Sequence, residues 1–327
     1  MKSLLSLAAL VTTVLATSRT SAPSGCITAG SGGTYSTIQA AVDSLSTTST
    51  TAQCIFIEAG TYNEQVVVSS REAQLTFYGY TSDTSSYSSN EVTITNDLSA
   101  ADGLSDDETG TLRVQATNFK AYNINIANTY GEGSQAIALS AYADSGYYAC
   151  QITGYQDTVL AETGYQLYAQ SYIEGATDFI FGQYSPAWFE ECDIGVLAAS
   201  EGTITANGRV GSSGTSYYVF NSCSIAAASG QTVADGAYYL GRPWTEYARV
   251  VFQYTTMTDV INSAGWIEWS SSEPNTEDVL FGEYGNAGAG ASGTRASFAE
   301  ELSAAISIDT ILGSSYTSAG YYDASYM

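Results

Sequence analysis

The sequence predicts an all-β fold, a right-handed parallel β-helix, with a short N-terminal capping helix and a C-terminal tail packed on the solenoid. Two observations support this prediction. The 327 residues include 31 Gly and 26 Tyr but only 4 Pro, and with many Ser and Thr this composition favours short strands joined by turns. The middle of the chain also contains an irregular repeat with one short strand pattern in each unit.

The predicted capping helix begins at the segment Ser36-Thr37-Ile38-Gln39, which has the pattern of a capping box. Apolar residues then recur at helical spacing as far as Leu45. After a Ser- and Thr-rich turn, Cys54-Ile55-Phe56-Ile57 predicts a buried strand that ends near Gly60. From this point strands dominate.

An isoleucine marks the same position in each unit of the repeat, and successive isoleucines are 26, 21, 21 and 31 residues apart. A period in the twenties with one buried strand in each turn indicates a solenoid. Because these units contain hardly any helix pattern, they favour a parallel β-helix over leucine-rich or helical arrays. The isoleucines are Ile126, Ile152, Ile173, Ile194 and Ile225.

Three of the five cysteines share an inward-facing position two residues before an isoleucine: Cys150, Cys192 and Cys223. The first two lie two coils apart, roughly 10 Å, which is too far for a disulfide. Cys192 and Cys223 lie on neighbouring coils, but their parallel Cβ vectors suit a bridge poorly. We therefore expect three free buried thiols, although secretion favours disulfides. For Cys26 and Cys54 both states stay open.

The N-terminus has the pattern of a signal peptide. Lys2 precedes an apolar run over residues 4–15, and the small residue Ala16 suits cleavage. The run is too short to span a bilayer. We expect residues 1–16 to be removed and residues 17–327 to form a single secreted, extracellular catalytic domain.

The composition also excludes several functions. The formal net charge of −24 lacks the basic footprint that binds nucleic acid or anionic membranes. The chain has no histidine, which excludes a Ser-His-Asp triad, a Cys-His dyad and His-ligated zinc. No Cys-x-x-Cys pair is present either, so we expect no metal and no cofactor. A monomer is the default expectation.

Two aspartates are spaced like the strands that precede them. Asp157 lies five residues after Ile152, and Asp178 lies five residues after Ile173. On adjacent coils about 4.8 Å apart, the carboxylates would lie roughly 5 Å from each other. Like charges this close drive the two pKa values apart, which yields a general acid and a nucleophile. The alternative is a pair of solvated aspartates in turns.

Neighbouring residues favour the catalytic interpretation. The amides of Gln135 and Gln156 can donate to a developing oxyanion. Arg242 can hold one aspartate ionised, and Trp244 can stack on a sugar. The segment Phe179-Ile180-Phe181-Gly182 would add apolar walls to the site.

Six ordered blocks resemble the pectin methylesterases, carbohydrate esterases that remove methyl groups from homogalacturonan. The resemblance covers essentially the whole mature chain and implies a right-handed parallel β-helix of the single-domain secreted microbial type, acting on methyl-esterified pectin. The blocks are Gly60-Thr61-Tyr62-Asn63-Glu64, Gln135-Ala136-Ile137-Ala138-Leu139, Gly154-Tyr155-Gln156-Asp157-Thr158, Asp178-Phe179-Ile180-Phe181-Gly182, Leu240-Gly241-Arg242-Pro243-Trp244 and Gly265-Trp266-Ile267-Glu268-Trp269.

The resemblance also implies a role for each candidate catalytic residue. Asp178, kept ionised by Arg242, would attack the methyl-ester carbonyl. Gln135, helped by Gln156, would stabilise the oxyanion. Asp157 would protonate the departing methanol and then act as the base for the water that cleaves the acyl-enzyme.

The resemblance further implies that Trp244 lines the sugar site. Tyr155, Phe179, Met257 and Trp266 are weaker candidates for substrate contact, and packing in the core or at the rim suits them equally. Because product galacturonate is anionic, the charge of −24 predicts a preference for highly methylated pectin.

Three rival functions remain. Paired carboxylates about 5 Å apart also suit a retaining glycosidase, but the nearest analogue of a polygalacturonase motif is Asn128-Thr129-Tyr130. A secreted aspartic protease would need two Asp-Thr/Ser-Gly motifs, and Asp157-Thr158-Val159 breaks that pattern. A β-helix that only binds pectin would have no reason to keep the aspartates, Gln135 and Arg242 together.

Overall fold

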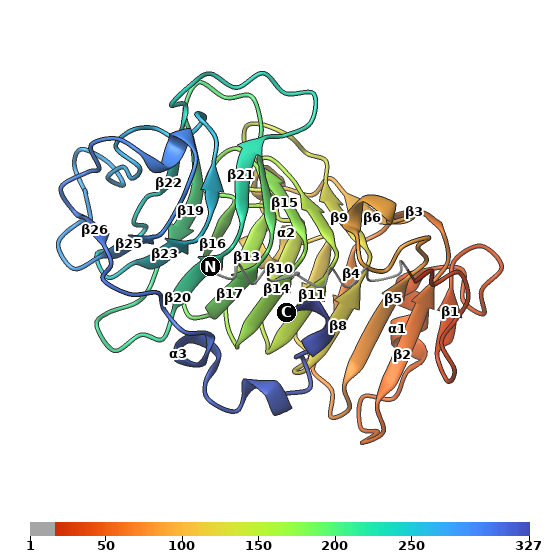
Figure 1. The fold of residues 1–327 in the computed structure, drawn as a ribbon. Coiled ribbons are helices and arrows are strands. Elements are labelled where there is room, and N and C mark those ends of the chain that lie inside the picture. Colours follow the sequence, from red (N-terminus) through yellow and green to blue (C-terminus); the bar gives the residue numbers. More distant parts are fainter. Residues whose placement is uncertain (1–16) are drawn as a thin grey trace, which may run out of the picture.

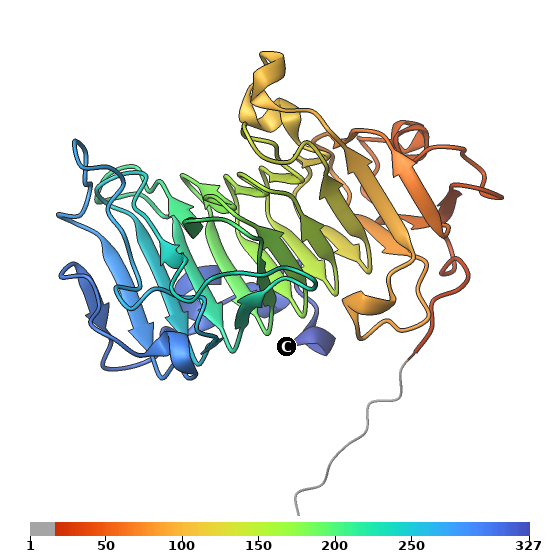
Figure 2. The same ribbon diagram turned by 90° about the horizontal axis from the view of Figure 1, so that it is seen from above.

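The computed structural model describes residues 17–327, so the predicted signal peptide lies outside the described residues. These residues form a parallel β-helix, as predicted (Figure 1). Three parallel sheets run along the solenoid, and strands that neighbour one another within a sheet come from successive coils (Figure 2). The three sheets are named here by their strand number.

The eleven-stranded sheet contains β1 (Ile27–Ala29), β2 (Gln53–Ile57), β5 (Leu75–Gly79), β8 (Phe119–Tyr122), β11 (Ser145–Tyr148), β14 (Gln166–Ala169), β17 (Pro186–Glu190), β20 (Tyr217–Asn221), β23 (Arg249–Gln253), β25 (Leu280–Tyr284) and β26 (Ala299–Glu301). The eight-stranded sheet contains β3 (Gly60–Asn63), β6 (Val92–Asn96), β9 (Asn125–Asn128), β12 (Gln151–Thr153), β15 (Tyr172–Gly175), β18 (Asp193–Val196), β21 (Ser224–Ala227) and β24 (Thr256–Met257). The seven-stranded sheet contains β4 (Val66–Val68), β7 (Leu112–Val114), β10 (Leu139–Ala141), β13 (Val159–Ala161), β16 (Ile180–Gly182), β19 (Gly202–Asn207) and β22 (Tyr238–Gly241).

Helices are short and lie outside the sheets. Within residues 17–327, none is long and apolar enough to cross a membrane. The α-helices are α1 (Ile38–Ser44), α2 (Asp106–Thr109) and α3 (Ile308–Leu312), and the 3₁₀ helices are η1 (Tyr87–Ser89), η2 (Ala100–Asp102), η3 (Ala289–Ala291), η4 (Tyr316–Ser318) and η5 (Ala324–Tyr326).

The isoleucines of the repeat stack in register along the eight-stranded sheet, which confirms that prediction. Each pairs with the isoleucine of the next coil, and all five side chains are buried in the main core. Buried side chains of this size each contribute about 1.5–3 kcal/mol by leaving water. The column runs through Ile126, Ile152, Ile173, Ile194 and Ile225.

An aromatic column lines the interior side of the eleven-stranded sheet. Successive ring centroids lie 5.0, 4.6, 4.2 and 4.3 Å apart, and the ring planes are nearly parallel. Stacked rings add favourable contacts beyond the area that they bury. This column is not predicted by the isoleucine repeat, and it consists of Tyr147, Tyr168, Phe189, Phe220 and Phe252.

The N-terminal helix is present, but the predicted capping box is wrong. Thr37 is the N-cap, and its hydroxyl accepts the N–H of Ala40 at 3.1 Å. The Glu64 carboxylate accepts the next free N–H groups, those of Ile38 and Gln39, at 2.9 and 3.0 Å. A carboxylate distant in sequence therefore accepts two of the N–H groups that the start of a helix leaves free, and the Gln39 side chain instead accepts the N–H of Val67 at 2.7 Å.

The C-terminal tail packs on the solenoid, as predicted. α3 lies against β17, and the side chains of Ile311 and Leu312 are buried in a second hydrophobic cluster there. Further along the tail, the carbonyl of Gly320 accepts a hydrogen bond from the Gln74 amide at 2.6 Å. The Tyr326 hydroxyl donates to the carbonyl of Thr84 at 2.9 Å.

The cysteines fall into two groups. Cys150, Cys192 and Cys223 are buried and free, which confirms the prediction. Cys26 and Cys54, whose state the sequence leaves open, form a disulfide. This bond ties the residue before β1 to β2, at the N-terminal end of the solenoid.

Replacing both bridged cysteines, Cys26→Ser with Cys54→Ser, is expected to lower the free energy of unfolding by about 3 kcal/mol, because the bridge restricts the unfolded chain. Thermal unfolding with and without a reductant measures the effect. The reductant should lower the melting temperature of the wild type and leave that of the double variant unchanged. Equal sensitivity of the two proteins to the reductant would contradict this prediction.

Candidate active site

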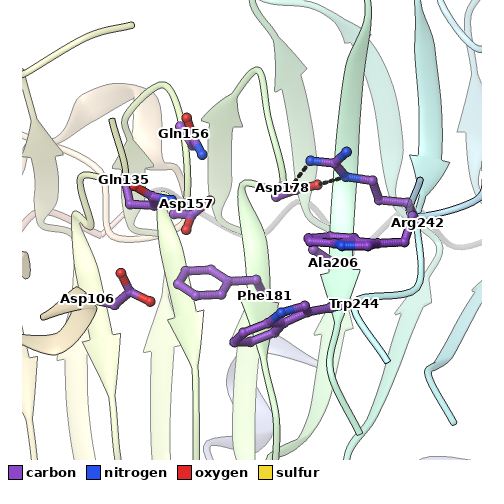
Figure 3. Close-up of a pocket in the computed structure, with 10 residues that line it drawn as sticks. Asp106, Gln135, Gln156, Asp157, Asp178, Phe181, Ala206, Arg242 and Trp244 are labelled. Carbon is purple, nitrogen blue, oxygen red and sulfur yellow. Dashed lines mark hydrogen bonds and ion pairs between the residues drawn. The ribbon is translucent and has the colours of Figure 1, made fainter. Parts of the chain in front are cut away.

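A pocket of about 230 Å³ opens on the outer face of the seven-stranded sheet, beside the turns that lead into β10, β13 and β16 (Figure 3). Because coils stack in register, side chains from segments far apart in the sequence meet there. The lining residues are Asp106, Gln135, Gln156, Asp157, Asp178, Phe181, Ala206, Arg242, Trp244 and Trp269.

Asp157 and Asp178 occupy equivalent positions on adjacent coils, as their spacing predicts. Asp157 follows β12 and Asp178 follows β15, and the N–H of Asp157 donates to the carbonyl of Thr177 at 3.1 Å. Both aspartates have a left-handed backbone, with φ of 64° and 50°, a region that Asp tolerates better than most residues. Only 7% and 5% of their surfaces stay exposed.

A bidentate ion pair holds Asp178. The Arg242 Nε donates to Oδ1 at 2.8 Å and the Arg242 Nη2 donates to Oδ2 at 2.6 Å. The Thr203 hydroxyl also donates to Oδ1, at 2.6 Å, and accepts the Asp178 N–H at 3.0 Å. The guanidinium lies 4.4 Å from the centroid of the Trp269 ring. Charge-assisted bonds of this kind stabilise the carboxylate form.

Asp157 has a different environment. In the described part of the chain its carboxylate has no hydrogen bond or ion pair. Burial raises the pKa of Asp157 well above its ordinary value, and the carboxylates of Asp178 and Asp106 raise it further, against a smaller opposing effect of Arg242. The surroundings of the two aspartates therefore differ. Asp178 faces the guanidinium of Arg242, whereas Asp157 is buried near other carboxylates, which raises its pKa.

A third acid, Asp106, lines the pocket, and the sequence analysis does not name it. It is the first residue of α2, and burial raises its pKa. This helix lies on an excursion between β6 and β7, so no position of the repeat marks Asp106. Nothing in the described residues groups three or more His, Cys, Asp or Glu side chains as metal ligands.

Gln135 and Gln156 line the pocket beside Asp157, where the sequence places them (Figure 3). Their segments are neighbours, because the N–H of Ala136 donates to the carbonyl of Gln156 at 3.2 Å. Neither side-chain amide has a hydrogen-bond partner among residues 17–327. Both amides are thus available to donate to a bound molecule.

Aromatic side chains form the wall of the pocket. Trp244 is among them, as the sequence indicates, and its ring centroid lies 6.1 Å from that of Phe181. Phe181 belongs to the segment that is predicted to form an apolar wall, whereas the sequence does not mark Trp269 as a contact. Tyr155 lines a neighbouring hollow of about 470 Å³, which shares Gln156 with the pocket.

Met257 and Trp266 do not reach the pocket, and their prediction as substrate contacts is wrong. Met257 is fully buried and pairs with Ile225 at the end of the isoleucine column. Trp266 is 1% exposed, and its ring stacks on Phe281 at 4.3 Å. Both side chains pack in the core and have no surface to offer a sugar.

The prediction of Phe179 as a substrate contact is also wrong, because its side chain is fully buried in the core. A simple alternation along a strand would place Phe179 and Phe181 on one face. Phe179, however, lies before β16, and regular alternation begins only at Ile180, whose side chain is also in the core. As a result Phe179 points into the core and Phe181 lines the pocket.

Comparison with known proteins identifies the family. A family model described as Pectinesterase matches residues 26–313. The chain belongs to the pectinesterase family. This pectinesterase, a carboxylic ester hydrolase, is 57% identical to a pectinesterase of Aspergillus niger, over 100% of this chain and 99% of the relative. It is 58% identical to one of Aspergillus aculeatus, over 99% of each chain.

Solved structures of the family share its fold. The crystal structure of the pectin methylesterase from Aspergillus niger in deglycosylated form matches with a TM-score of 0.88 and 45% identity, over 95% of this chain and 100% of that one. Pectin methylesterase from carrot matches with a TM-score of 0.81 and 28% identity, over 93% and 98%. The resemblance inferred from the six sequence blocks is confirmed.

The raised pKa of Asp157 predicts a pH-dependent stability difference. Because the native state binds this proton more tightly than the unfolded state, the contribution of Asp157 to stability is lost as pH rises through the raised pKa. Asp157→Asn should therefore become more stable relative to the wild type as pH increases. Melting temperatures of both proteins across the acidic to neutral range measure this.

The matched control is Asp309→Asn, which removes the same charge from an exposed position in α3. Its melting temperature should follow that of the wild type at every pH. A constant difference between Asp157→Asn and the wild type at all pH values would refute the assignment of a raised pKa.

Proposed function

We propose that this pectinesterase hydrolyses galacturonate methyl esters in pectin with Asp178 as the nucleophile and Asp157 as the general acid and base. The asymmetry of the aspartate pair carries the proposal. Asp178 has the bidentate Arg242, whereas Asp157 has no hydrogen-bond or ion-pair partner among residues 17–327 and a raised pKa. A nucleophile must be ionised and an acid must hold a proton, and the two environments favour these states.

The contacts of Asp178 favour Oδ2 as the attacking oxygen. Oδ1 accepts hydrogen bonds from Arg242 and Thr203, whereas Oδ2 accepts one, from Arg242. In the first step Oδ2 bonds to the ester carbon and the bond to the methoxy oxygen breaks. Asp157 transfers its proton to that oxygen, methanol leaves, and the galacturonyl group remains as an anhydride on Asp178.

In the second step the Asp157 carboxylate takes a proton from a water molecule whose oxygen adds to the acyl carbon. The bond to Asp178 then breaks, which restores its carboxylate beside Arg242 and releases a galacturonic acid, which loses its proton to solvent and becomes the carboxylate product. Asp157 serves first as acid and then as base, and a raised pKa suits a group that must both give and take a proton.

The oxyanion of each tetrahedral intermediate needs donors. We assign this role to Gln135 and Gln156, because both amides line the pocket and have no partner in residues 17–327. Donors that are already positioned typically contribute about 2.7–4 kcal/mol of transition-state stabilisation.

We further propose that methyl-esterified pectin binds along the aromatic wall, with Trp244 and Tyr155 among the contacts. Phe181 and Trp269 are further proposed contacts, because they line the catalytic pocket together with Trp244. The names of the relatives support pectin as the substrate. In our proposal the enzyme acts as a secreted monomer after loss of residues 1–16, and it has no nucleic-acid or membrane partner.

The decisive experiment is methanol release from methylated pectin. Asp178→Asn is expected to lower kcat by more than about a thousandfold, because the amide is a poor nucleophile. Asp309→Asn should retain wild-type activity. Assaying new reducing ends in the same reactions tests the glycosidase alternative: their appearance without methanol would overturn the esterase proposal, and unchanged methanol release by Asp178→Asn would overturn the nucleophile assignment.

Thr203→Val is expected to lower kcat about 10- to 100-fold with little change in KM, because it deletes a hydrogen bond to a charged carboxylate without changing the side-chain shape much. Thr203→Ser, which keeps the hydroxyl, should restore most of the activity. If Val and Ser lowered kcat equally, the hydroxyl would not position Asp178.

A further inference from the structure

Next to the catalytic pocket lies a second hollow of about 220 Å³, which we call the acidic hollow. It shares Asp106, Phe181 and Trp244 with the catalytic pocket, so the two spaces adjoin. Asp107 and Glu162 supply two further carboxylates to its lining.

The three acids of the hollow differ in their partners. Asp107 forms an ion pair with Arg113 and accepts a hydrogen bond from the Ser140 hydroxyl at 2.7 Å. Asp106 and Glu162 have no ion pair among residues 17–327. Glu162 accepts the N–H of Gln183 at 3.1 Å. Two uncompensated carboxylates therefore face the same space.

These two acids already interact unfavourably. Burial raises the pKa of Asp106, and burial raises the pKa of Glu162, against the lowering effect of the Gln183 N–H and with a smaller contribution from the charge of Asp106. Arg242 is a cation that lines the adjoining catalytic pocket, and Asp178 already engages it through two hydrogen bonds. A further anion entering the hollow would meet like charges without a free cation.

The rest of the lining suits a neutral sugar. Leu160, Phe181 and Trp244 supply apolar and aromatic surface, and Phe181 and Trp244 continue into the catalytic pocket. A methyl-esterified galacturonate offers apolar C–H groups and a neutral ester to this surface. The same residue without its methyl group carries a carboxylate.

We propose that Asp106 and Glu162 form a specificity subsite that accepts the esterified neighbour of the galacturonate being hydrolysed and disfavours a de-esterified one. This inference rests on the proposed function, because it assumes that pectin occupies the catalytic pocket. The net charge of −24 predicts a preference for highly methylated pectin from the whole chain. The proposed subsite attributes this preference to two carboxylates, each of which can be neutralised by a single substitution.

Asp106→Asn and Glu162→Gln remove each charge with nearly the same shape. The measurement is the ratio of kcat/KM on highly methylated pectin to kcat/KM on sparsely methylated pectin, at the highest pH at which the wild type is active. Each variant should lower this ratio about three- to tenfold, because one like charge a few ångströms away is removed. A ratio cancels effects on the chemical step, including any change in the pKa of Asp157.

Inhibition by fully de-esterified oligogalacturonate gives a readout that does not depend on turnover of a second substrate. Its inhibition constant should fall about three- to tenfold in each variant, and this difference should shrink in high salt. Asp309→Asn, which removes a distant exposed charge, should match the wild type in both measurements.

The outcomes separate the two proposals. If the wild type releases no methanol from any pectin, the proposed function fails. If it releases methanol but both variants keep the wild-type ratio and inhibition constant within twofold, the subsite is overturned and the esterase proposal stands. Should Asp106→Asn fail to fold, as judged by its melting temperature, Glu162→Gln decides alone.

Discussion

The hydrogen-bonded stacking of parallel strands sets the distance between coils, and this spacing decides which side chains can act together. Neighbouring parallel strands lie about 4.8 Å apart, and the pairing of Ile152 with Ile173 keeps successive coils in register. Any residue at a given turn is therefore beside its counterpart on the next coil. Asp157 and Asp178 meet in this way, and Gln135 and Gln156 lie beside them.

The same stacking brings like charges together, and the surroundings make them chemically different. Asp178 receives a guanidinium from a later coil, and the Trp269 ring lies against that guanidinium. Asp157 receives neither, and burial and nearby carboxylates raise its pKa. Two identical side chains on equivalent turns thus lie in different surroundings, and those of Asp157 raise its pKa. The difference arises from neighbours that are not part of the repeat.

The parts of the molecule that follow the repeat are the parts that the sequence predicts well. The isoleucine column, the three free thiols and the adjacent aspartates all depend on spacing alone. Departures from regular spacing escaped prediction. Phe179 enters the core because it lies before β16, where strand alternation has not yet begun, and Asp106 reaches the pocket on a helix between coils.

Contacts between segments remote in sequence could not be predicted from the sequence either. Glu64, which follows β3, accepts an N–H group at the start of α1, and Cys26 forms a disulfide with Cys54 of β2. Such pairings depend on how the chain returns on itself, which local propensity does not encode. Trp266 illustrates the same limit. It lies in one of the six blocks that resemble the family, but its ring stacks on Phe281 in the core.

A stack of coils in which each contacts only its neighbours would be able to fray from either end. The C-terminal tail changes that expectation, because Gln74 and Thr84 on early coils bond to Gly320 and Tyr326 near the end of the chain. Opening the early coils therefore also breaks contacts of the tail. Because α3 in the same tail packs on β17 and β20, the tail links local opening of the early coils to that of coils in the middle of the solenoid.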